Sequence, residues 1–332
     1  MSSGEVRTSI YVVTGCAGFI GSHVAERLLA RGDAVIGIDN MNGPDGASVK
    51  AKNLSLLTGH AKFDFHRTDI RDVSAVADAL SGKDIKSIIH LAALVGVRSS
   101  IEDPYSYFET NVLGTLNILE CARGTKPETF VLGSSSSVYG DRAKVPFSET
   151  DRTDEPISPY AASKKACEIT CYTYYHTYNV PVTCLRFFTV YGPRGRRDMA
   201  PYKFMDAIAR RRSIEVFGDG KSERDYTFIG DIVSGVVAAA ERPSGFEIIN
   251  LGNSDPISLD GFISIIEQIV GDEAIRVRRP PQPGDVRRTY ADISKARSLL
   301  GYAPGTTLRD GLTAMYNWYV SEVHADRDPL QG

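Results

Sequence analysis

Two side chains four residues apart have the spacing of a proton-transfer pair. Tyr160 and Lys164 are the first and last residues of the segment Tyr-Ala-Ala-Ser-Lys, and on a helix they share one face. A tyrosine with an ordinary pKa near ~10 is a poor base at neutral pH, but a neighbouring ammonium stabilises its phenolate. The pair could then take a proton from a hydroxyl group. An amphipathic helix without catalytic residues has the same spacing, so this interpretation needs a second motif.

A glycine-rich segment near the N-terminus is that second motif. Gly15, Gly18 and Gly21 follow an apolar run at residues 10–13 and precede a helical pattern. The first glycine allows a tight turn, the second lets the backbone approach a pyrophosphate, and the third allows close helix packing. Free N–H groups at the helix N-terminus then face the phosphates. An ordinary strand-to-helix turn is the alternative, and the spacing and context favour a dinucleotide site.

An acidic residue ends the next expected strand. Asp39 follows Gly21 by 18 residues, and Asn40 is expected to assist it. A carboxylate there accepts the hydroxyls of an adenosine ribose and repels a 2′-phosphate, which favours NAD over NADP. A strand-end aspartate that only forms a turn is the alternative.

A serine run, Ser134 to Ser137, follows the strand expected at residues 129–132. It therefore lies at the carboxyl edge of the predicted sheet. A hydroxyl at this edge could hydrogen-bond the oxygen atom that reacts. A flexible serine loop is the alternative, and the strand before it favours an ordered one.

The elements that must position these groups alternate along the chain. We expect strands at residues 10–13, 34–39, 63–65, 87–91, 129–132 and 181–187, and helices at 24–32, 73–80, 104–123, 159–178, 198–211 and 259–270. Buried strands that alternate with helices indicate an α/β fold with a doubly wound parallel sheet. We assign residues 8–188 to an NAD-binding domain and 189–325 mainly to a smaller C-terminal α/β lobe that binds the substrate.

Composition argues against several classes of protein. The 332 residues carry a net charge of -3 without a basic stripe, so no nucleic-acid partner is expected. No run approaches the ~20 apolar residues that span a membrane, and the N-terminus lacks an apolar signal region. Five cysteines without a pairing pattern and six histidines without ligand spacing predict no disulfide and no metal. These features together predict a cytoplasmic protein.

Taken in order, these motifs resemble the extended short-chain dehydrogenase/reductase family, whose dinucleotide-binding half is a Rossmann-type fold. The matching segments are residues 14–21, 39–40, 90–93, 111–115, 135–140 and 160–164, and the resemblance runs from about Ile10 to Trp318. Within the family, residues 185–196 and 198–200 are similar to UDP-glucuronate 4-epimerases. One stretch departs from the pattern, because Met41 to Gly46 replaces a tyrosine-rich loop.

The resemblance implies a role for each matching residue. The catalytic residues would be Tyr160, Lys164 and Ser135, the first two also touching the cofactor. The other residues that bind NAD would be Gly15, Gly18, Phe19, Ile20, Gly21, Asp39, Asn40, Asp69, Ile70, Leu91, Ala92, Ala93, Asn111 and Phe188. The sugar carboxylate would lie among Ser136, Ser137, Thr189 and Arg196, and the uridine diphosphate among Phe217, Arg224 and Arg287.

Four reactions that share this scaffold begin with oxidation at C4 of the sugar. Dehydration needs an acid and a base where this chain has Ser136 and Ser137, and decarboxylases typically carry a glutamate at the position of Ser137. Arg196 offers a bidentate partner for a carboxylate, although an exposed arginine bound to nothing is the alternative.

We therefore predict a UDP-glucuronate 4-epimerase that forms UDP-galacturonate through a 4-keto intermediate with bound NAD. The alternatives are a UDP-glucose 4-epimerase, a UDP-glucuronate decarboxylase and a non-catalytic NAD-binding protein, and the last class usually lacks the Tyr/Lys pair. The helices at 104–123 and 159–178 carry more apolar and aromatic residues than one sheet face needs. In relatives they form a four-helix interface, so the resemblance implies a homodimer.

Overall fold

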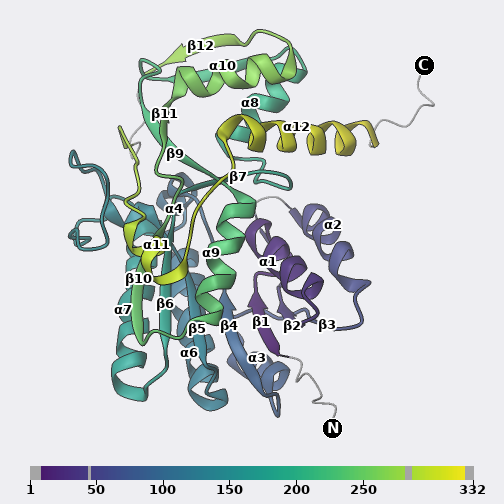
Figure 1. Cartoon of the computed structure of the whole chain (residues 1–332), viewed down its shortest axis with the longest axis vertical. Helices are drawn as coiled ribbons and strands as arrows, with labels where there is room; N and C mark the ends of the chain where they lie inside the picture. Colours follow the sequence, from purple (N-terminus) through teal and green to yellow (C-terminus); the bar gives the residue numbers. More distant parts are fainter. Residues whose placement is uncertain (1–8, 44–45, 281–285, 326–332) are drawn as a thin grey trace.

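The computed structural model describes residues 9–43, 46–280 and 286–325. Residue 8, the first of the expected NAD-binding domain, and residues 44–45 of the atypical loop lie outside this part of the chain. A large lobe holds a central sheet, and a smaller lobe lies at one end of it (Figure 1). Within the described ranges, no helix is long and apolar enough to cross a membrane.

The large lobe is built on a seven-stranded sheet in the order β10-β6-β5-β4-β1-β2-β3, with every neighbouring pair parallel. Its strands are β1 (Ile10–Thr14), β2 (Ala34–Ile38), β3 (Phe63–His66), β4 (Ile85–His90), β5 (Thr129–Ser135), β6 (Val182–Phe187) and β10 (Phe246–Leu251). The strand order reverses between β1 and β4, and ligands of such folds bind at the carboxyl ends of the strands at this point. The predicted doubly wound fold is confirmed.

Helices cover both faces of the sheet, because neighbouring side chains of each strand point to opposite faces. Tyr11 and Val13 of β1 pack in one buried cluster, and Val12 packs in another. The first cluster includes α1 (Phe19–Ala30) and α9 (Ile229–Glu241), and the second includes α3 (Val73–Leu80), α6 (Gly114–Thr125) and α7 (Pro159–Tyr178) (Figure 1). Strands buried on both sides read as continuous apolar runs, which is why they were predictable.

Several helical regions differ from the prediction, which also lacked helices at residues 97–102, 229–241, 294–300 and 308–325. The helix expected at 104–123 is divided into α5 (Pro104–Tyr107), a π-helical turn (Phe108–Leu113) and α6. Such turns are frequent at functional sites. Helix α2 (Gly46–Thr58) was not predicted, because only Asn53 and Leu57 of its residues are buried and its sequence has little periodicity.

The small lobe has its own core. Its elements are β7 (Thr189–Tyr191), β8 (Ser213–Phe217), β9 (Glu223–Phe228), β11 (Pro256–Ser258), β12 (Ile275–Arg279), α8 (Ala200–Ala209), α10 (Leu259–Val270) and α12 (Leu308–Ala325). After β9 the chain returns to the large lobe, where α9 packs on the sheet and β10 forms its edge beside α11 (Ser294–Leu300). The two lobes are therefore not consecutive parts of the chain.

A buried ion pair connects α7 to the sheet. The guanidinium of Arg186 on β6 donates two hydrogen bonds of 2.8 Å to the Glu168 carboxylate on α7, and Ser134 of β5 donates a third at 2.7 Å. The two charged side chains are 1% and 2% exposed. Arg186 also lies 4.7 Å from the centroid of the Tyr139 ring. This network sets the position of α7 along the ends of β5 and β6.

Glu168→Gln is expected to lower the free energy of unfolding by about 3–5 kcal/mol, because it leaves a buried guanidinium without its counter-charge. Glu215 on β8 forms an exposed pair with Arg279, so Glu215→Gln is a matched control and should change stability by less than about 1 kcal/mol. Urea unfolding of the two variants measures both values. Equal losses would mean that the buried pair contributes no more than a surface pair.

Candidate active site

The glycine loop between β1 and α1 has the geometry of a phosphate cradle. Gly15 has φ +71°, and a Cβ atom there would lie 2.8 Å from the Ala92 nitrogen. A Cβ atom on Gly21 would lie 2.1 Å from the Gly15 oxygen. Gly18 caps α1 without a side-chain hydrogen bond, so the first N–H groups of the helix remain available to an anion. The loop, together with Phe19 and Ile20 in the first turn of α1, therefore fits a dinucleotide pyrophosphate.

Asp39, directly after β2, has three hydrogen-bond donors around its carboxylate. Its carboxylate accepts hydrogen bonds from the Ala17 and Met41 N–H groups at 3.1 and 2.8 Å, and the ammonium of Lys50 lies 2.7 Å away. The Asp39 side chain is 1% exposed. Lys50 belongs to α2, and sequence reasoning did not identify it. Its charge offsets that of Asp39 and weakens the repulsion that a lone carboxylate would exert on a 2′-phosphate.

Asn40, Asp69 and Ile70 form a wall beyond the ends of β2 and β3. Asn40 donates to Asp69 at 2.9 Å, and Arg71 forms a bidentate pair with the same carboxylate. The hydrogen bond from Arg71 holds the pKa of Asp69 well below its ordinary value. Ile70 is buried against Gly114, where a Cβ atom would lie 2.5 Å from Ile70 Cδ1. These contacts hold Asn40, Asp69 and Ile70 in place, as an adenine site would need.

The segment after β4 is tied to its neighbours by side chains. The Leu91 and Ala92 N–H groups donate to Thr14 Oγ1 at 3.2 and 3.1 Å. Beyond Ala93, the Leu94 backbone exchanges two hydrogen bonds with the Asn111 amide, which also donates to Ser163 on α7. Asn111 on the π-helical turn therefore links this segment to the helix of Tyr160.

Phe188, which was expected near the nicotinamide end of the cofactor, lies in the core. It is 4% exposed and packs beside the rings of Tyr139 and Phe147.

The expected catalytic residues gather at the carboxyl end of β5. Tyr160 and Lys164 lie in the first turns of α7, and Lys164 Nζ donates to the Gly133 oxygen at 2.7 Å. The Tyr160 ring meets that of Tyr107 edge to face, with centroids 6.2 Å apart. Ser135 ends β5 and its hydroxyl contacts Ser137 at 3.1 Å. The network of Glu168 holds these two elements together, and no sequence pattern had pointed to it.

A cavity of about 1240 Å³ lies between the two lobes. Ser136 and Ser158 line it, whereas the expected catalytic residues Ser135, Tyr160 and Lys164 do not. Six of the seven expected substrate residues line it, namely Ser136, Ser137, Thr189, Arg196, Phe217 and Arg224. Arg287 is exposed and does not line it, although Val286 and Thr289 do. Sequence reasoning missed Arg98 of α4 (Val97–Glu102), which lies 5.5 Å from the Phe217 ring across the cavity. The sequence signal for Arg98 was its position shortly after β4, at the carboxyl edge of the sheet where ligands bind.

Arg196 lines the cavity near Tyr107, whose ring meets that of Tyr160. Its Nε and Nη2 atoms bind the two oxygens of Asp198 at 3.0 and 2.6 Å. The arginine is thus paired with a carboxylate of the protein itself, and its role toward a substrate carboxylate stays a prediction.

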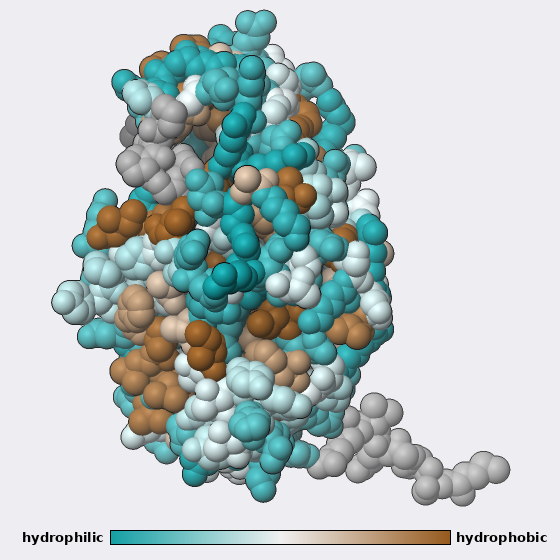
Figure 2. All heavy atoms as spheres, turned by 90° about the vertical axis from the view of Figure 1, so that its left-hand side faces the viewer, coloured by the Kyte–Doolittle hydropathy of each residue, from teal (hydrophilic) through white to brown (hydrophobic). Residues whose placement is uncertain are grey.

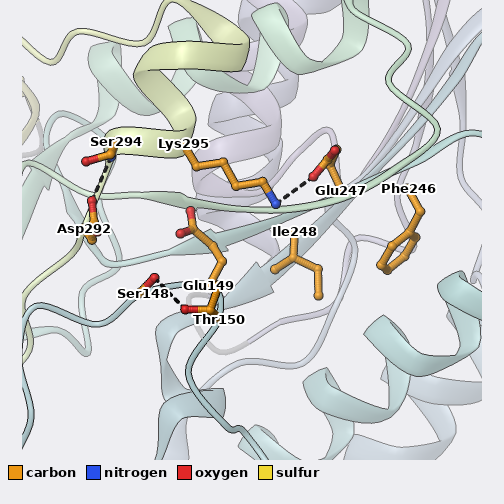
Figure 3. Close-up of a pocket in the computed structure, with 9 residues that line it drawn as sticks. All are labelled: Ser148, Glu149, Thr150, Phe246, Glu247, Ile248, Asp292, Ser294 and Lys295. Atoms are coloured by element: carbon orange, nitrogen blue, oxygen red, sulfur yellow. Dashed lines mark hydrogen bonds and ion pairs between the residues drawn. The ribbon is translucent and has the colours of Figure 1, made fainter.

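A second cavity, of about 410 Å³, lies at the edge of the sheet beside β10 (Figure 3). Lys295 of α11 reaches toward Glu247, with an N–O distance of 2.6 Å, and Glu149 accepts the Asn250 N–H at 2.8 Å. Burial raises the pKa of Glu149. None of the expected site residues lies here, so the larger cavity is the candidate active site.

Comparison with known proteins agrees with this geometry. The family model described as GDP-mannose 4,6 dehydratase matches residues 12–315. A UDP-glucuronate 4-epimerase of Thermodesulfobacterium geofontis is 42% identical over 309 residues, which are 93% of this chain and 95% of the relative. A probable UDP-glucuronate 4-epimerase of Rhizobium meliloti is 38% identical and covers 93% and 96%.

Solved structures are similar over almost the whole chain. UDP-glucuronic acid 4-epimerase from Bacillus cereus, in complex with UDP-glucuronic acid and NAD, superposes with a TM-score of 0.88 at 37% identity and covers 94% of this chain and 99% of that one. A UDP-glucose 4-epimerase from Thermotoga maritima with UDP-glucose has the same TM-score at 30% identity and covers 95% and 99%. The chain therefore belongs to the extended short-chain dehydrogenase/reductase family.

Proposed function

We propose that this protein is a UDP-glucuronate 4-epimerase that interconverts UDP-glucuronate and UDP-galacturonate with bound NAD. The observation that carries the proposal is the position of Arg196, which lines one cavity with Ser136, Ser137 and Thr189. A guanidinium and three hydroxyls are donors suited to a carboxylate. The relatives and solved structures with this activity in their names support the proposal.

NAD, when bound, would supply the hydride acceptor and donor at its nicotinamide ring. The N–H groups of the Gly15–Gly21 loop would hold its pyrophosphate, and the Asp39 carboxylate would accept its adenosine ribose hydroxyls. Lys164 and Tyr160 would border its nicotinamide half. The tight approaches at Gly15 and Gly21 are what this assignment requires of the loop.

The chain's own residues would move one proton and hold one anion. Tyr160, as a phenolate stabilised by the Lys164 ammonium, would take the proton from the sugar O4 hydroxyl, while the Ser135 hydroxyl hydrogen-bonds the same oxygen. Tyr160 would return the proton after the keto sugar has turned over in the cavity.

The sugar carboxylate must be held in a fixed orientation because the 4-keto intermediate is a β-keto acid. Such an acid loses carbon dioxide when the bond from C5 to the carboxylate aligns with the carbonyl π system. Donors from Ser136, Ser137, Thr189 and Arg196 would hold the carboxylate out of that alignment. An acid at position 136 or 137, which a dehydratase or decarboxylase would need, is absent from this sequence.

We also propose that the protein is a homodimer joined by a four-helix bundle. Large apolar or aromatic side chains that are 43–82% exposed lie on α4, the segment 104–113 and α7, namely Ile101, Tyr105, Phe108, Leu113, Ile169 and Tyr172. Exposed apolar residues that gather on adjacent helices are typical of interfaces. Figure 2 shows one face of the protein, on which apolar side chains gather mainly over the lower, sheet-containing lobe.

A cytoplasmic location is proposed on the state of the cysteines. All five are buried and carry free thiols. Free thiols in a chain of this size are typical of a reducing compartment.

The activity itself is tested by incubating the purified protein with UDP-glucuronate or UDP-glucose and identifying products by NMR. Formation of UDP-galacturonate, with little turnover of UDP-glucose, is expected. A strong preference for UDP-glucose would replace the proposal with a neutral-sugar epimerase.

Tyr160→Phe should abolish turnover and leave the cofactor bound, because the glycine loop is untouched. NMR of the products measures the first effect, and quantifying NAD released on denaturation measures the second. Activity above about a tenth of wild type, a barrier change under ~1.4 kcal/mol, would remove Tyr160 from the base role.

Asp39→Asn should raise the affinity for NADP relative to NAD. The substitution removes the negative charge and frees Lys50, whose ammonium then becomes available to a 2′-phosphate. Dissociation constants of both dinucleotides, measured by calorimetry, test this. An unchanged ratio of the two constants would mean that Asp39 does not face the adenosine ribose.

Arg196→Ala should lower turnover of UDP-glucuronate by roughly ten- to a hundredfold, because a charge-assisted bidentate contact contributes on the order of 1.5–3 kcal/mol. Any neutral UDP-sugar that the enzyme accepts should lose far less. The variant should also release some carbon dioxide and a 4-keto-pentose product. Arg211, whose side chain is 80% exposed outside the cavity, is the matched control as Arg211→Ala. Equal losses on both sugars would make Arg196 a structural or phosphate-binding residue.

A further inference from the structure

The expected carboxylate-binding arginine already holds a carboxylate of the protein. Arg196 Nε lies 3.0 Å from one oxygen of Asp198, and Nη2 lies 2.6 Å from the other. Two parallel N–H···O bonds are the strongest geometry that a guanidinium offers to a carboxylate. Both residues line the large cavity. Asp198 therefore occupies the edge of Arg196 that a substrate carboxylate would also prefer.

This pair lies beside the expected proton-transfer site. A Cβ atom on Gly96 would lie 3.4 Å from the Tyr107 hydroxyl and 3.7 Å from Arg196 Nη2, so these two groups share one neighbourhood. The Tyr107 ring in turn meets the Tyr160 ring edge to face. An anion bound by Arg196 would accordingly lie near the end of the sugar at which Tyr160 acts.

The partial exposure of the Arg196–Asp198 pair would allow another carboxylate to replace that of Asp198. The Arg196 side chain is 19% exposed and that of Asp198 is 45% exposed. Asp198 can thus be rehydrated when it leaves, and water at its carboxylate lowers the net strength of the pair. The Glu168–Arg186 pair, with 1–2% exposure, has no such access to water.

We propose that Asp198 sets the affinity of the site for uronic-acid nucleotides, as an internal carboxylate that occupies Arg196 until the carboxylate of such a nucleotide displaces it. The inference rests on the proposed function. A neutral sugar cannot compete for the guanidinium and leaves the internal pair intact. A uronate replaces one ion pair with another, so its affinity is reduced by the strength of the pair that it breaks.

Asp198→Asn tests this exchange. In the NAD-loaded protein, calorimetry should show UDP-glucuronate binding roughly two- to fivefold more tightly than in wild type, the range expected for losing a weak competing ion pair. UDP-glucose should bind as before. Asp272→Asn is the matched control, because it removes the same charge from an exposed pair with Arg211 outside the cavity and should leave both affinities unchanged.

A second comparison isolates the role of the guanidinium. In an Arg196→Ala background, Asp198→Asn should no longer favour UDP-glucuronate, because the group for which the two carboxylates compete is gone. A persistent gain in that background overturns the proposal. Equal gains for both sugars would also overturn it, since they indicate a general charge effect. Weaker binding of UDP-glucuronate to Asp198→Asn would instead make Asp198 a residue that positions Arg196.

The proposed function and this inference can be refuted by different results. Wild-type protein that binds UDP-glucuronate in the calorimeter but forms no UDP-galacturonate refutes the epimerase and leaves the exchange measurable. Protein that does not bind UDP-glucuronate at all refutes both.

Discussion

The arrangement of the candidate site depends on one buried contact, the pair between Glu168 and Arg186. Tyr160, Lys164 and Glu168 are spaced four residues apart on α7, so they lie along one side of the helix. A buried carboxylate tolerates little displacement, because any other position leaves two charges without partners in a dry interior. Fixing Glu168 against Ser134 and Arg186 therefore also fixes where Tyr160 and Lys164 stand relative to the end of β5.

Much of the fold was predictable because its main signals are local. Strands covered on both faces read as apolar runs, and α3, α7 and α10 have the predicted bounds. The features that were missed depend on tertiary contacts. The π-helical turn carries Asn111, whose amide is engaged by the loop after β4, and α2 packs with only two buried side chains. The return of β10 to the sheet edge follows from strand pairing, which one segment alone cannot reveal.

The residues of the candidate site also fall into those that a local pattern predicted and those that depend on tertiary contacts. Residues in motifs, such as the glycines after β1 and the serines after β5, were identified because a strand end predicts its place in a parallel sheet. Their partners were not. Lys50 reaches Asp39 from a helix without a clear pattern, and Glu168 meets Arg186 across an interface between α7 and β6. Pairing between distant residues has no spacing that a single sequence displays.

Three carboxylate–cation pairs of this site differ chiefly in burial, and burial determines what each can do. The Glu168–Arg186 pair is shielded from water on both sides and can serve only as structure. In the Lys50–Asp39 pair the lysine is 17% exposed and the carboxylate 1%, so Asp39 stays in place while its charge is partly offset. Asp198 is 45% exposed and Arg196 is 19% exposed, so the acid can leave for water while the arginine remains in the cavity wall. A site that must recognise an arriving carboxylate needs a cation of this last kind, because a bare buried guanidinium would be unstable and a fully buried pair could not open.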